Sequence, residues 1–136
     1  MSTALLALAL QCLAPGGPDA DRIAPAIVAA VEARVARGLP PITESPTLDV
    51  CLVATYVAHE SGANVAPHPV SWDAGAGVSC GALQMACERV RGRSVRWQVG
   101  AWLRDVVDSS LAKVDSSPTR AAVRLAQARE MLRAAL

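Results

Sequence analysis

Large side chains are scarce in this sequence. Its 136 residues include no phenylalanine, one tyrosine and three tryptophans, although 52% of the residues are apolar. Much of the apolar content is alanine, which is the best helix former but fills little space in a core. The composition therefore predicts close-packed helices with small residues at their contacts. The few aromatic side chains are predicted to be either core anchors or platforms for a ligand.

Charge and long apolar runs are also limited. Charged residues make up only 18% of the chain, and so much apolar content excludes an intrinsically disordered protein. No run approaches the roughly 20 apolar residues that cross a bilayer, so we expect no membrane span. The stretch T-A-L-L-A-L-A-L-Q-C-L-A near the start of the sequence is mostly apolar, and no Lys or Arg precedes it, since Arg22 is the first basic residue. Because a signal peptide carries a positive segment before its apolar core, we interpret this stretch as a first helix rather than a cleavable signal.

The cysteines and histidines lack the spacing of a metal site. None of the four cysteines forms a C-x-x-C pair, and only two histidines accompany them, so we predict no metal and no cofactor. Four cysteines permit two disulfides in three connectivities. Cys80 and Cys87 bracket the segment G-A-L-Q-M and could close that turn, in which case the protein matures in an oxidising compartment. Alternatively, the cysteines are buried free thiols.

The net charge of +1 is divided unevenly along the chain. Residues 1–85 carry three arginines against seven acids, a charge of −4, and residues 86–136 carry ten basic residues against five acids, a charge of +5. A basic face suits an anionic polymer, whereas the simpler interpretation is solvated helix faces. No recognition motif accompanies the segment R-V-R-G-R-S-V-R at 89–96, so we expect no nucleic-acid partner.

Helix signals cover most of the chain. Apolar periodicity, N-caps and Gly or Pro breaks predict helices at about residues 2–13, 19–37, 46–61, 82–91, 94–114 and 118–135. The helix over 46–61 starts at Ser45-Pro46, ends at Gly62 and is apolar on nearly every side, which places it at the centre of a domain. No stretch alternates with period two. We predict an all-α fold, with a single domain over residues 1–136 and about six helices around the helix 46–61.

Glu60 is the sharpest candidate for a catalytic residue. It is the only acid between Asp49 and Asp73, at the end of the apolar helix and before a Gly-rich loop. Burial at that position would raise the pKa of the carboxyl, and the helix C-terminus acts in the same direction. A protonated carboxyl is what cleavage of a glycosidic bond needs. Tyr56 lies one turn earlier and could bound a pocket. The alternative is a glutamate that simply faces water.

The segment around Glu60 resembles a known enzyme family. The motif H-E-S-G-A-N, then D-A-G-A-G, then G-A-L-Q is similar to the pattern of lytic transglycosylases in the lysozyme-like superfamily, over about residues 46–90. The resemblance places Glu60 on the catalytic acid and Ser61 on the serine that follows it. It places Gly81, Leu83 and Gln84 on the turn that ends in the family's glutamine, and it implies that Ser61 and these three residues bind the substrate. The N-terminal A-L-A-L-Q-C-L-A-P resembles the opening of transglycosylases linked to type IV secretion.

The resemblance implies a fold, an activity and a place of action. It implies a lysozyme-like domain that breaks the β-1,4 bond between N-acetylmuramic acid and N-acetylglucosamine in peptidoglycan, where one glutamate is first acid and then base. The 6-hydroxyl of the muramic acid closes on the anomeric carbon and gives a 1,6-anhydro product. Action would be outside the cytoplasm, in the periplasm or from a phage virion. Partners would be glycan strands and proteins of a virion or secretion apparatus.

Two other readings stay open. A hydrolytic lysozyme would pair Glu60 with Asp73, the only acid in the loop. A lysozyme-like structural or wall-binding component would need no catalysis. The family's downstream Ala-Tyr-Asn motif has no counterpart here, because neither Tyr nor Asn follows Gly81. A tryptophan would have to supply the sugar platform, and Trp72 in the loop is a better candidate than Trp97 or Trp102.

Overall fold

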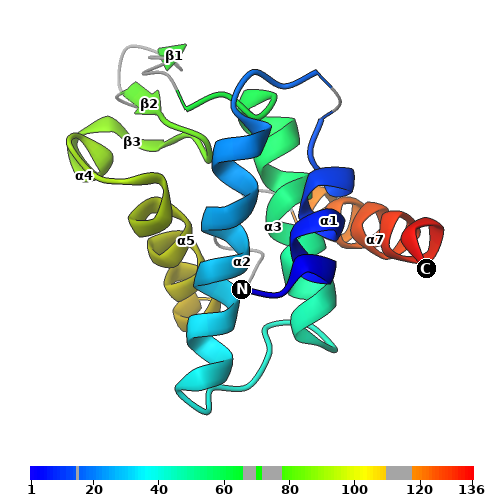
Figure 1. Cartoon of the computed structure of the whole chain (residues 1–136). Coiled ribbons are helices and arrows are strands. Elements are labelled where there is room, and N and C mark those ends of the chain that lie inside the picture. The colour runs from blue at the N-terminus through cyan, green and yellow to red at the C-terminus, as the bar shows by residue number, and fades with distance from the viewer. Residues whose placement is uncertain (15, 66–69, 72–77, 110–117) are drawn as a thin grey trace.

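The computed structural model describes residues 1–14, 16–65, 70–71, 78–109 and 118–136 (Figure 1). Its helices are α1 (Thr3–Cys12), α2 (Ala20–Ala36), α3 (Pro46–Ser61), α4 (Cys87–Val90), α5 (Val95–Ser109) and α7 (Pro118–Ala135). Three short strands, β1 (Val70–Ser71), β2 (Val78–Cys80) and β3 (Met85–Ala86), form an antiparallel sheet in that order. The described part of the chain is mostly helical, and the prediction of an all-α fold is confirmed.

Helix α3 is the central element. Every residue from Leu48 to Val57 is buried, and the helix packs against α1, α2 and α7. The Ser45 hydroxyl accepts a hydrogen bond from the Leu48 amide at 3.1 Å, and Pro46 occupies the first helical position. Gly62 ends the helix in the left-handed conformation. In Figure 1, α5 and α7 lie on opposite sides of the pair formed by α2 and α3.

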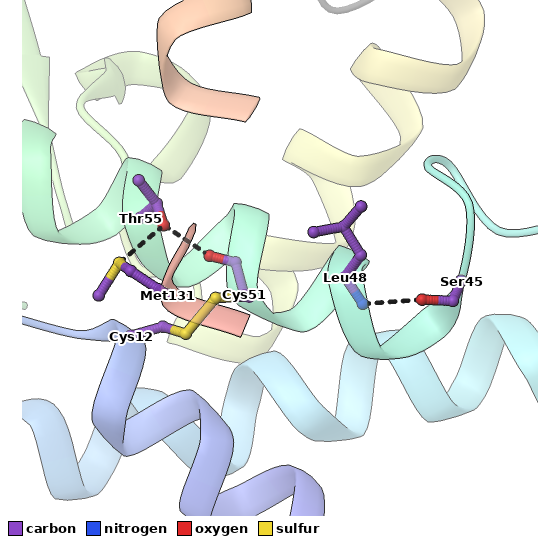
Figure 2. Close-up of a disulfide and its surroundings, with 6 residues drawn as sticks. All are labelled: Cys12, Ser45, Leu48, Cys51, Thr55 and Met131. Atoms are coloured by element: carbon purple, nitrogen blue, oxygen red, sulfur yellow. Dashed lines mark hydrogen bonds between the residues drawn. A yellow bond between two sulfur atoms is a disulfide. The ribbon is translucent and has the colours of Figure 1, made fainter. Parts of the chain in front are cut away.

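A disulfide and a small polar contact connect the helices around α3 (Figure 2). Cys12, at the end of α1, is bonded to Cys51 in the middle of α3. One turn later, the Thr55 hydroxyl donates to the Cys51 carbonyl at 2.8 Å and lies 3.8 Å from the Met131 sulfur of α7. The structure thus joins α1, α3 and α7 through one buried region.

The core has the small contacts that the composition predicted. Several alanines at helix contacts are completely buried: Ala9, Ala24, Ala54, Ala101 and Ala128. Aliphatic residues fill most of the remaining space, and among the described residues one pair of aromatic rings packs within the core. The Tyr56 and Trp102 centroids lie 5.0 Å apart with the planes tilted by 51°. Trp102 is therefore a core residue and not a platform for a sugar.

Asp49 holds the loop that leads into α3. Its side chain is 3% exposed and accepts hydrogen bonds from the Ile42 amide at 2.9 Å and the Thr43 amide at 2.7 Å. The Thr43 hydroxyl also donates to it, at 2.6 Å. Because Asp49 lies in the first turn of α3, the helix dipole favours its negative charge there. Sequence reasoning gave this residue no role.

The prediction of a helix over 82–91 was wrong in its first half. Residues 81–84 form a turn, Met85 and Ala86 form β3, and α4 extends only from Cys87 to Val90. The reason is local, since Gly81 has φ of 85° and Gln84 has φ of 49°, and a helix cannot contain left-handed residues. The resulting hairpin pairs Cys80 with Met85. Its strands are too short to show an alternating pattern in the sequence.

Helix α5 follows the hairpin and is joined to α4 by an ion pair. Helix α5 starts at Val95 as predicted, and its expected end near Val114 lies outside the described residues. Arg89 of α4 forms a bidentate ion pair with Asp105 of α5. This hydrogen bond raises the pKa of Arg89 above its ordinary value. No helix in the described ranges has both the length and the hydropathy to cross a membrane.

Candidate active site

Glu60 lies in the last turn of α3, and its side chain is exposed. The expectation that burial would desolvate this carboxyl is therefore wrong. Residues up to Val57 are covered by neighbouring helices, Ala58 is half-buried, and His59 and Glu60 extend beyond the core. The apolar residues before Glu60 thus indicate that the preceding turns of α3 are buried, and they do not indicate burial of the last turn.

The chain reverses sharply immediately after Glu60. Gly62 and Ala63 both have left-handed backbone conformations, with φ of 63° and 59°. The Ser61 hydroxyl donates to the Val57 carbonyl at 3.1 Å and accepts from the Asn64 amide at 3.3 Å. A left-handed alanine is strained by about 1 kcal/mol, so the surrounding contacts must impose this conformation on Ala63.

Those contacts come from the linker between α1 and α2. The Asp19 amide donates to the Ala63 carbonyl at 3.0 Å, and the Asp19 carboxylate accepts from the Val65 amide at 2.8 Å. Gly17 lies so close that a Cβ there would be 2.6 Å from the Ala63 Cβ and 2.7 Å from the Gly62 carbonyl oxygen. The turn after the carboxylate is therefore fixed by residues more than forty positions away, such as Asp19 to Val65 with a separation of 46.

The second half of the motif forms an equally constrained turn. Ala82 and Leu83 are buried in the core, at 1% and 4% exposure. The Gln84 amide and side-chain Nε2 both donate to the Gly81 carbonyl, at 3.2 Å and 2.9 Å. A Cβ at Gly81 would collide with the Oε1 atom of Gln98 on α5. Gln84 is half-buried, and it is the turn's best-exposed side chain.

These positions revise some expected roles. Leu83, predicted to contact substrate, is a core residue that anchors the turn. Gly81 serves the backbone conformation and the close approach of Gln98. The structure joins Cys80 to Cys87, so a covalent bridge closes the hairpin that carries Gln84. Figure 1 shows the hairpin of β2 and β3 at the same end of the molecule as the C-terminal end of α3.

The aromatic residues do not form an open wall among the described residues. Tyr56 is 3% exposed and packs on Trp102, so it does not bound a pocket as expected. Trp97 is half-buried, and the guanidinium groups of Arg93 and Arg104 lie 4.6 Å and 5.9 Å from its ring centroid. The predicted roles of Trp72 and Asp73 lie outside the described residues.

A groove lies beside His59, the residue that precedes Glu60. It has a volume of about 620 Å³ and runs between the end of α1, the end of α3 and α7. His59, Glu130 and Met131 line it, with mostly apolar atoms between them. Neither Glu60 nor Gln84 is part of its lining. Within the described ranges, no group of three or more His, Cys, Asp or Glu side chains could hold a metal ion.

Comparison with known proteins adds no relative to this picture. No protein-family model, no curated protein and no solved structure matches the chain. The interpretation of the site therefore depends on the sequence motif and on the geometry described above.

Proposed function

We propose that this protein is a peptidoglycan-cleaving lytic transglycosylase with a lysozyme-like domain, in which Glu60 is the catalytic residue. The observation that carries the proposal is the position of Glu60. It is an exposed carboxylate on the last turn of a buried helix, followed directly by the constrained turn of Ser61 to Val65. A catalytic group has to be accessible to a polymer and fixed in position, and this arrangement supports both requirements.

In the proposed reaction, Glu60 first donates a proton to the leaving glycosidic oxygen. The resulting carboxylate then takes the proton of the muramic acid 6-hydroxyl as that oxygen bonds to the anomeric carbon. One carboxylate therefore suffices, where most glycosidases use two. Because the Glu60 side chain is exposed, the bound glycan itself has to exclude water from the carboxyl before it can hold the proton.

The neighbouring residues have supporting roles in this proposal. The Gln84 side chain extends from a left-handed position in a turn closed by Cys80 and Cys87, and its amide can hydrogen-bond a sugar. Ser61 already uses its hydroxyl proton on the Val57 carbonyl, so its first role is to hold the turn. It can still accept a further bond. Gly81 and Leu83 keep the Gln84 turn in place.

The proposed place of action is the cell wall, outside the cytoplasm. The two disulfides, Cys12–Cys51 and Cys80–Cys87, support maturation in an oxidising compartment. The glycan strands of peptidoglycan are then the substrate. Proteins of a phage virion or of a secretion apparatus are the proposed partners, and neither a cofactor nor a nucleic acid is part of the proposal.

Digestion of purified sacculi tests the catalytic role directly. We expect wild-type protein to release muropeptides with 1,6-anhydro ends, detected by mass spectrometry. Glu60→Gln should lower the rate by at least about 100-fold, because general acid–base groups contribute factors of that size. Glu88→Gln makes the same chemical change at an exposed glutamate of α4 and should keep the wild-type rate. An unchanged rate in Glu60→Gln would remove Glu60 from the mechanism.

The same digestion separates two alternatives. Hydrolysed rather than anhydro ends would indicate a lysozyme, with Asp73 as the second carboxylate. The second candidate function is a lysozyme-like component that binds the wall without cleaving it. It is favoured by the aromatic side chains, since Tyr56 and Trp102 are buried and Trp97 is covered by arginines. Retention on sacculi without any soluble product would support this candidate.

A further inference from the structure

A cleft lined by arginines lies away from the Glu60 site. It has a volume of about 400 Å³, between the last turns of α2 and one face of α5. Arg34 and Arg37 line it from α2 and its C-cap, and Arg96 and Arg104 line it from α5. No acidic side chain is among the lining residues. We call this feature the arginine cleft.

Capping of α2 does not require these arginines. The Gly38 amide donates to the Val35 carbonyl at 2.9 Å, and the Leu39 amide donates to the Arg34 carbonyl at 3.1 Å. With Gly38 at φ of 72°, this is the left-handed cap that satisfies the last carbonyls of a helix through the backbone. The helix dipole favours cations at this end, but that argument applies only to Arg34 and Arg37.

Arg34 is held in place and keeps one unused donor. Its Nη2 atom donates to the Pro40 carbonyl at 2.9 Å, which fixes the guanidinium against the loop after α2. Its Nε atom is buried and has no acceptor among the described residues. A buried donor without a partner is rare in native proteins and commonly indicates a water or an ion.

One of the two cleft arginines on α5 lies where the helix dipole disfavours it. Arg96 is in the first turn of α5, where the positive end of the helix disfavours a cation. Gly100 lies one turn after it, and a Cβ there would meet only the Arg104 Nη1 atom, at 3.9 Å. A glycine inside a helix costs about 1 kcal/mol relative to alanine. Its missing side chain leaves the space between Arg96 and Arg104 open.

Two other arginines of the segment 89–96 contact side chains outside the cleft. Arg89 is paired with Asp105, and the Arg93 guanidinium lies 4.6 Å from the Trp97 ring centroid, closer than the guanidinium of Arg104 at 5.9 Å. The segment therefore does not form one continuous basic stripe that could follow a nucleic-acid backbone. The positive charge is instead concentrated in a cleft of small volume.

We propose that the arginine cleft binds a phosphate group, either as a free phosphate or as part of a polymer. Guanidinium forks match phosphate oxygens in pairs, and a multiply charged anion neutralises several of the four lining cations. The Glu60 end of α3 contacts the start of α2 through Asp19, whereas the cleft contains Arg34. Fourteen residues of helix separate the two by roughly 20 Å. The phosphate site is thus independent of the proposed catalysis.

Calorimetric titration with inorganic phosphate and pyrophosphate tests the proposal. We expect saturable binding of one anion per chain, which the double variant Arg96→Gln/Arg104→Gln weakens at least about tenfold, because charged hydrogen bonds are lost. Arg22→Gln is the matched control, since it removes an exposed arginine from the opposite end of α2. Gly100→Leu should also prevent binding by filling the cleft while all four arginines remain.

A second titration distinguishes the source of the phosphate. Binding of a poly(glycerol phosphate) that competes with pyrophosphate indicates a polymer-borne group, and binding of the small anions alone indicates a free phosphate. Both results support the site. The proposal is overturned if neither phosphate nor pyrophosphate binds, or if Arg22→Gln weakens binding as much as the double variant. It is also overturned if only duplex DNA binds.

Discussion

The two ends of the α2–α3 pair are built in different ways. At the carboxylate end, defined as Glu60–Val65 with the linker Gly17–Asp19, backbone atoms pack closely around two left-handed residues. At the opposite end, the arginine cleft is formed by long side chains around a helix terminus whose carbonyls the backbone already satisfies. One end depends on the exact course of the main chain and the other on the concentration of charge. The first end holds the residue of the proposed reaction, and the second is the site of the proposed anion binding.

Each end nevertheless contains an aspartate whose carboxylate accepts hydrogen bonds from a loop. Asp19 accepts a bond from the Val65 amide and so fixes the chain after Glu60. Asp49 accepts three bonds from Ile42 and Thr43 and so fixes the loop that contains Pro40, the acceptor for Arg34. Asp49 is buried, whereas Asp19 is only half-buried. Substitutions at the two ends therefore test the two aspartate-held loops separately.

The largest effect on stability is expected at Asp49. Asp49→Ala removes three hydrogen bonds to a buried carboxylate and leaves two backbone amides without that acceptor. The free energy of unfolding should fall by about 3 kcal/mol or more, as measured by urea denaturation. Asp21→Ala removes an exposed aspartate from the first turn of α2 and should change it far less. Equal effects of the two variants would show that the Asp49 bonds do not hold the loop.

The next effect is expected at Gly17. In Gly17→Ala, the new methyl group would lie within 2.7 Å of the Gly62 carbonyl oxygen and 2.6 Å of the Ala63 Cβ, so the turn after Glu60 must shift. Overpacking of this kind lowers the free energy of unfolding by about 1–3 kcal/mol. If the turn positions Glu60, cleavage of sacculi should fall in the folded variant as well. Normal stability in thermal unfolding would contradict the close approach.

The smallest effect has the opposite sign. Gly100→Ala is the same substitution in α5, and its methyl group meets only the Arg104 Nη1 atom at 3.9 Å. Because alanine favours helix over glycine, the free energy of unfolding should rise by about 0.5–1 kcal/mol. Thermal unfolding of the two glycine variants side by side measures the contrast between the ends. A loss of stability in Gly100→Ala would mean that the cleft is more tightly packed than its geometry indicates.

Much of the central helix could be predicted from the sequence. The start at Ser45-Pro46 and the end at Gly62 agree with α3, because capping and proline signals act within a few residues. The alanine-rich composition likewise predicted small helix contacts. The motif around Glu60 and Gln84 suggested a chemistry, and that suggestion stays a prediction. The strands of the hairpin could not be predicted, since two or three residues carry no periodicity.

The sequence alone determined where α3 begins and ends, and it placed Glu60 in the last turn. The packing of distant segments, in contrast, leaves this last turn exposed and places Tyr56 against Trp102 instead of facing a pocket. It also selected the pairs Cys12–Cys51 and Cys80–Cys87 from three connectivities, and it placed Arg34 and Arg96 in the lining of one cleft. Caps and helix periods depend on adjacent residues, whereas exposure and clustered charge depend on which distant segments pack together.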